Sequence, residues 1–67
     1  MELIEVTKEK IVLSLSQEEV AFLCNAIAES LHAIDDWEFQ TRTGHSPKQA
    51  EEMRVQLAQF LCQADLL

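Results

Sequence analysis

The residues most suited to chemistry lie between Asp36 and Gly44, in the sequence DWEFQTRTG. This segment holds the only Trp, one of three Phe, and the only Gly of the chain. Trp and Arg are favoured anchors of protein interfaces, so Trp37 and Arg42 indicate a recognition corner. A purely structural role is the alternative, in which Trp37 and Phe39 close the end of a helical pair.

Polar residues around this segment extend the predicted site. Glu38 and Arg42 have the i,i+4 spacing of an ion pair on one helix face. Asn25 and Glu29 lie one turn apart on a preceding helix and are placed to reach the same corner. We therefore predict an interaction site formed by Asn25, Glu29, Trp37, Glu38, Phe39, Arg42 and His45.

Catalytic and metal chemistry find little support in the sequence. It contains no phosphate-binding glycine loop, no HExxH, no GxSxG and no set of Cys and His with metal-ligand spacing. The acidic pairs are explained by helix starts, where negative charge is favoured; they are Glu18-Glu19, Asp35-Asp36 and Glu51-Glu52. We expect no catalytic residue, no cofactor, no metal site and no enzyme activity.

A helix-turn-helix motif is a second interpretation of the same region. A short helix, a turn at residues 43–45 and a capped helix from Ser46 imitate that layout. Arg42, His45 and Lys48 would give it a small basic patch. However, Glu51 and Glu52 fall early in the recognition helix, and the net charge of −7 repels phosphates. A small DNA-binding regulator is therefore the alternative function, and a nucleic-acid partner is disfavoured.

Three helix starts divide the rest of the chain. Ser16 with Glu19, and Ser46 with Gln49, have the spacing of capping boxes, and Asp35 with Glu38 repeats it. Gly44 is placed to end the middle segment in a left-handed conformation. Apolar residues at helical spacing follow the first and last starts. We predict helices at about 17–34 and 47–64, with a short helical turn over 36–43.

The first fifteen residues have a strand-like composition. Segments 2–6 and 11–15 are rich in β-branched and aliphatic residues, and residues 7–10 could join them as a hairpin. The predicted fold is α+β: an N-terminal β-hairpin packed on an antiparallel helical pair. The 67 residues form one small domain.

Such a short chain has difficulty in forming a sufficient core. A domain near 60 residues buries only about 60% of the surface of its unfolded chain. Cys24 and Cys62 are predicted to be reduced thiols, because there is no CxxC and no secretion signal. Self-association then becomes the favoured remedy, and we expect a homodimer.

Charge and hydropathy indicate the cellular location of the protein and the class of its binding partner. Twelve acidic against five basic residues favour a basic protein as partner, although the charge could serve solubility alone. No apolar run reaches the length of a membrane span. The N-terminus also lacks the pattern of a secretory signal. We expect a cytoplasmic protein with no membrane partner.

The sequence resembles a group of small, functionally uncharacterised bacterial proteins over roughly residues 12 to 60. The shared sequence motifs are Asn-Ala-aliphatic-x-Glu and Glu-Phe-x-Thr-Arg-x-Gly, followed by a capped helix. Here they are formed by Asn25, Ala26, Ile27, Glu29, Glu38, Phe39, Thr41, Arg42, Gly44 and Ser46. The resemblance implies a bacterial protein and transfers no catalytic residue. By analogy, genes of this size include acidic immunity-like or antitoxin-like inhibitors.

Overall fold

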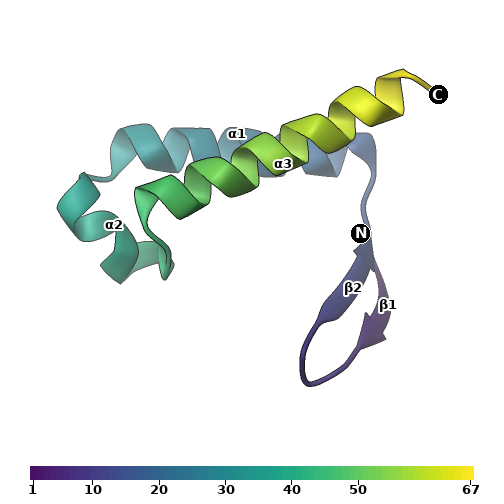
Figure 1. The fold of residues 1–67 in the computed structure, drawn as a ribbon, viewed down its shortest axis with the longest axis horizontal. Coiled ribbons are helices and arrows are strands. Elements are labelled where there is room, and N and C mark those ends of the chain that lie inside the picture. The colour runs from purple at the N-terminus through teal and green to yellow at the C-terminus, as the bar shows by residue number, and fades with distance from the viewer.

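A computed structural model describes all 67 residues and has an α+β arrangement, which confirms the predicted class. An antiparallel hairpin precedes three helices (Figure 1). In chain order the elements are β1 (Glu2–Val6), β2 (Ile11–Ser14), α1 (Gln17–Ala33), α2 (Asp36–Thr43) and α3 (Pro47–Asp65). The predicted bounds agree with these to within one residue. None of the helices combines the length and apolar character needed to cross a bilayer.

Local hydrogen bonds at the helix ends explain why the elements begin where they do. The Ser16 hydroxyl accepts from the Glu19 N–H at 3.1 Å, and the Glu19 carboxylate accepts from the Ser16 N–H at 2.9 Å. Ser46 and Gln49 form the same pair of bonds, at 3.2 and 3.0 Å. Gly44 ends α2 with φ 87°, in the left-handed region that favours glycine. Both capping boxes and the glycine terminator are confirmed.

The third predicted cap, at Asp35, is only half correct. Asp35 precedes α2 with an extended backbone, and its carbonyl accepts from the Glu38 N–H at 3.0 Å. Its side chain accepts no capping bond. The Glu38 carboxylate lies near Arg42 instead of reaching back to the cap. Negative charge at the start of α2 thus acts through the helix dipole alone.

The core is formed where α1 and α3 pack antiparallel along most of their length (Figure 1). Only Cys24, Phe39 and Ala50 are buried, and they come from α1, α2 and α3 respectively. The Cys24 thiol points to the Arg54 carbonyl, 3.7 Å away, while Cys62 is exposed. The short α2 thus completes the core by contributing one aromatic ring.

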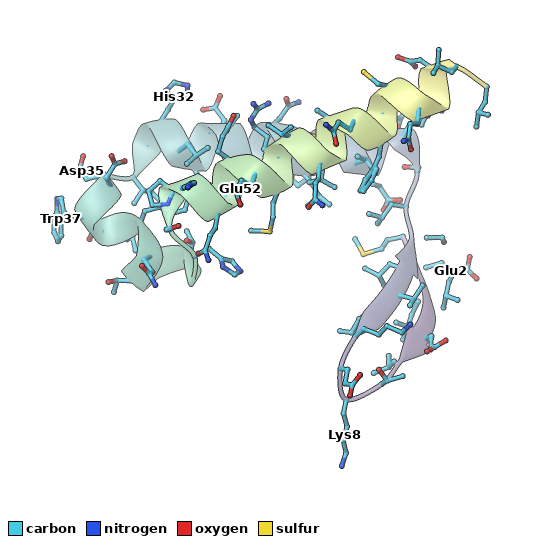
Figure 2. All side chains as sticks on the ribbon, viewed as in Figure 1. Glu2, Lys8, His32, Asp35, Trp37 and Glu52 are labelled. Atoms are coloured by element: carbon cyan, nitrogen blue, oxygen red, sulfur yellow. The ribbon has the colours of Figure 1, made fainter.

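The hairpin does not pack on the helical pair as predicted. It projects from the N-terminal end of α1, every residue of β1 is exposed, and Lys8 lies at the tip farthest from the helices (Figure 2). Ser16, as the N-cap, has an extended backbone with φ −71° and ψ 162°, so the strand meets the helix at an angle. The hairpin and α1 meet only at their ends, and the hairpin does not pack against a face of the helix.

The resulting shape is flat and open. The radius of gyration is 13.5 Å and the principal extents are 38 × 32 × 16 Å. A compact domain of this length would have a radius of gyration of about 11 Å. The shortest extent, 16 Å, spans the two packed helices α1 and α3, one in front of the other in Figure 1. The hairpin does not pack on this helical pair, so the helices lack the covering sheet that was predicted.

Candidate interaction site

Trp37 is the most exposed aromatic side chain and lies in the first turn of α2. Its side chain points away from the body of the protein (Figure 2), and 79% of the residue surface is exposed. An indole exposed to this extent contributes nothing to the core. Trp37 is therefore free to contact a partner, as its place in the predicted site requires.

Phe39, two residues later, has the opposite environment. It is 2% exposed and is the largest fully buried side chain of the chain. Successive positions on a helix are 100° apart, so residues i and i+2 lie on opposite sides of α2. Phe39 belongs to the core in this conformation. Its inclusion among the interaction residues is corrected accordingly, and only Trp37 of the two aromatics is accessible.

Glu38 and Arg42 form the predicted i,i+4 pair. The Arg42 Nε lies 3.8 Å from the Glu38 Oε1, and both side chains are partly exposed. An exposed pair of this kind contributes little to stability. Its effect is to hold the guanidinium near the last turn of α2, where positive charge is favoured.

Asn25 and Glu29 do not join this corner. Both are exposed, and neither side chain forms a hydrogen bond or ion pair with α2. The α1 residues that line the groove beside Phe39 are Leu23, Ala26, Ile27 and Ser30. Asn25 and Glu29 lie on the other side of α1 by helical periodicity. The sequence showed that the pair shares a face, but not that α2 turns toward the opposite one.

His45 lies in the turn between α2 and α3 and lines the same groove. Its backbone N–H donates to the Thr43 hydroxyl at 3.3 Å, and that hydroxyl also donates to the Phe39 carbonyl at 2.8 Å. The predicted site is thus divided. Trp37 and the Glu38–Arg42 pair are exposed on α2, His45 and Phe39 line the groove, and Asn25 and Glu29 lie elsewhere.

The groove between α1 and α3 is the surface that the sequence did not reveal. Its first part, about 240 Å³, extends from Phe39 and His45 to Met53. Its second part, about 270 Å³, continues past Leu57 to Phe60. The two parts share Leu23, Ile27 and Met53, so they form one open apolar channel, here called the helix groove. Helical spacing predicted this apolar stripe but not that it stays uncovered.

A second uncovered apolar surface lies on the hairpin. Leu3 pairs with Leu13 and Val6 pairs with Ile11, so all four side chains share one face, here called the hairpin face. Leu3 and Val6 would lie on opposite faces of a regular strand. An irregularity between Leu3 and Glu5 inserts one residue and returns Val6 to the face of Leu3. The four residues are 43 to 64% exposed.

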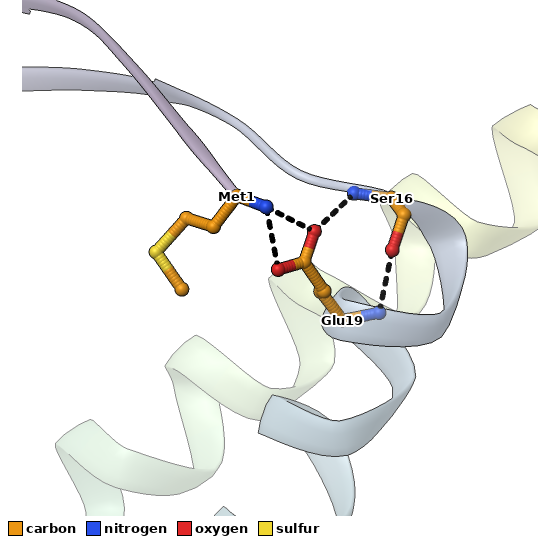
Figure 3. Close-up of polar contacts among 3 residues, drawn as sticks. All are labelled: Met1, Ser16 and Glu19. Carbon is orange, nitrogen blue, oxygen red and sulfur yellow. Dashed lines mark hydrogen bonds and ion pairs between the residues drawn. The ribbon is translucent and has the colours of Figure 1, made fainter.

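One polar cluster fixes the base of the hairpin to α1. The Met1 amino group lies 2.9 and 2.7 Å from the two Glu19 carboxylate oxygens, beside the Ser16 cap (Figure 3). The hydrogen bond from the Met1 amine, and then that from the Ser16 N–H, lower the pKa of Glu19 below its ordinary value of 4.5. The cluster therefore favours the ionised carboxylate.

We expect acid to release this cluster. The folded-state pKa of Glu19 is depressed, so its stabilising contribution is complete above the ordinary pKa and is lost as the pH falls through the lower folded value. A carboxyl-detected NMR titration should place the Glu19 midpoint below 4.5. In the Glu19→Gln variant, the Met1 signals should lose this acid transition. An ordinary Glu19 midpoint, or an unchanged Met1 transition in the variant, would contradict the assignment.

The other ionisable groups form one local pair and no larger cluster. The Arg54 Nε donates to the Glu51 Oε2 at 2.8 Å, and this bond lowers the pKa of Glu51 and raises that of Arg54. No group of three or more His, Cys, Asp or Glu residues is placed to hold a metal ion. The arrangement offers apolar contact surface and an acidic exterior.

No family model matches the chain, and neither a curated protein nor a solved structure shows significant similarity to it.

Proposed function

We propose that this chain is a non-enzymatic protein-interaction module that works as a homodimer. One observation supports this most directly: the chain exposes 5604 Å² of surface. A folded monomer of 7.6 kDa would expose about 4,300 Å². Each copy thus carries an excess of about 1,300 Å², much of it from the exposed apolar residues of the hairpin and helices.

The excess is of the size that a stable interface needs. A standard interface buries about 800 Å² on each partner, and obligate dimers bury more. Contiguous apolar patches of more than a few hundred Å² are rare on monomers and mark interaction sites. Covering this surface with a second copy would give both chains the core that neither has alone.

The finer form of the proposal assigns the dimer a basic partner protein in the bacterial cytoplasm. Support comes from the net charge of −7, which accelerates encounter with a cationic surface. Trp37 supplies an exposed aromatic anchor beside acidic groups at the start of α2. An acidic inhibitor or immunity-like protein would have these properties.

Sedimentation equilibrium at micromolar chain concentration tests the homodimer. We expect a mass twice the 7.6 kDa of one chain. A stable monomer with cooperative unfolding would overturn the proposal.

The finer form is tested by titrating a basic protein encoded beside this gene and following Trp37 fluorescence. A matched Trp37→Phe variant should bind the same protein without the fluorescence change. If neither the wild type nor the variant binds, that protein is excluded as the partner.

DNA binding remains the second candidate, since α2 and α3 are joined by a short turn at residues 44–46. Arg42, His45 and Lys48 are all exposed near this turn. The acidic Glu52 is exposed on the same helix as Lys48, only one turn later, which disfavours a phosphate contact. Absence of duplex binding at about 50 mM salt would exclude this function, because phosphate contacts are strongest at low salt.

A further inference from the structure

We propose that the hairpin face of one copy occupies the helix groove of a second copy, and reciprocally. This inference rests on the proposed homodimer and adds its architecture. Each chain would then contribute Leu3, Val6, Ile11 and Leu13 to the core of the other. The dimer would then contain two equivalent cores, and in each core the hairpin of one chain packs on the helical pair of the other.

The hairpin requires such a support. An isolated two-stranded hairpin is marginally stable in water, and a third strand or a packed helix is needed to stabilise it. Its own chain provides only the Met1–Glu19 cluster at the base. The hairpin face is aligned by an irregularity in β1, which brings Leu3 and Val6 to the same side of the strand.

The hairpin and the groove of one chain cannot cover each other in this conformation. The hairpin leaves the end of α1 and points away from the helices, and α2 projects on the same side (Figure 1). The groove lies on the helical pair and opens beside Phe39, His45 and Met53. A second copy related by a twofold axis satisfies both surfaces at once, because an isologous interface uses each complementary pair twice.

The charge distribution favours the hairpin over a helical surface as the occupant. Residues 1–15 carry three carboxylates and two lysines, whereas residues 16–67 carry nine carboxylates and three basic side chains. Two helical surfaces of equal acidic charge would repel each other on approach. The hairpin is the least acidic part of the chain: Lys8 lies at its far end (Figure 2), and Lys10 belongs to the turn there, where its carbonyl accepts from the Thr7 N–H. It therefore approaches an acidic copy at the smallest electrostatic cost.

Edge-to-edge pairing of two hairpins is the competing arrangement. It would join strand backbones into a four-stranded sheet and leave the helix groove uncovered. The hairpin edges carry Glu2, Glu5 and Lys10, charged residues of the kind that discourage such pairing. Docking into the groove instead covers both apolar surfaces with one contact.

Two variants of neighbouring residues test the inference. Leu13 lies on the hairpin face, and the exposed Ser14 is adjacent on the opposite face of β2. We expect Leu13→Asp to raise the dimer dissociation constant by about a hundredfold or more, because it places a charge in an apolar contact. Ser14→Asp, which adds the same charge to the same strand at an exposed position, should change it by less than about tenfold.

Intermolecular NMR contacts in the wild-type protein keep the test decisive if a variant fails to fold. A mixed dimer of labelled and unlabelled chains should show contacts between Leu13 methyls and those of Met53 or Leu57. A stable dimer with equal dissociation constants for the two variants, or with contacts between strands only, would overturn the docking and leave the homodimer intact. A wild-type monomer would overturn both.

Discussion

Phe39→Ala is expected to abolish cooperative folding at 25 °C. Truncating a buried Phe costs about 3–5 kcal/mol through lost transfer free energy and the cavity left behind. The total stability of a 67-residue domain is of similar size, about 3 to 10 kcal/mol. Phe39 is one of only three buried residues, so no neighbouring core exists to absorb the cavity. Urea unfolding followed by circular dichroism, at equal chain concentration, measures the loss.

Trp37→Ala provides the matched control. It removes a larger aromatic ring from the same helix, two residues away, but from a position that is 79% exposed. Exposed substitutions without special contacts change stability by less than about 0.5 kcal/mol. Equal destabilisation by the two variants would contradict the assignment of Phe39 to the core and Trp37 to the surface.

These two aromatics mark the limit of what the sequence can specify about the site. Their spacing places them on opposite sides of a helix, so one of them had to be accessible. Which one is buried depends on how α2 packs against α3 across the turn at Gly44, where Ala50 is also buried. Local sequence contains the turn but not the packing. The division of the predicted site into exposed residues of α2 and a groove follows from that packing.

The helix ends could be predicted because their information is local. A cap joins Ser16 to Glu19, or Ser46 to Gln49, over three residues, and the hydrogen bonds form wherever the helix begins. Asp35 shows where this reasoning fails. Glu38 had two compatible partners, the cap behind it and Arg42 ahead of it, and only the structure shows which one it approaches.

The hairpin shows why the larger arrangement could not be predicted. The alternation of Ile11, Leu13 and Leu15 with Val12, Ser14 and Ser16 indicated a strand with one apolar face, and that face exists. Alternation carries no information about what covers the face. In this chain nothing does, because the extended cap at Ser16 directs the hairpin away from the helices. The strand and its apolar face are therefore predictable from local sequence, whereas the direction of the hairpin relative to the helices is not.

The midpoint of thermal unfolding should rise with protein concentration. When a native dimer unfolds to two separate chains, a hundredfold higher concentration favours the dimer by about 2.7 kcal/mol. Two chains of 67 residues have an unfolding entropy of about 0.28 kcal/mol/K, from about 2.1 cal/mol/K per residue. The midpoint should therefore rise by about 10 °C between about 10 µM and 1 mM, as followed by circular dichroism. A midpoint independent of concentration would mean that the open, flat chain folds alone. Aggregation does not imitate the expected result, since it removes unfolded chains and lowers the apparent midpoint at high concentration.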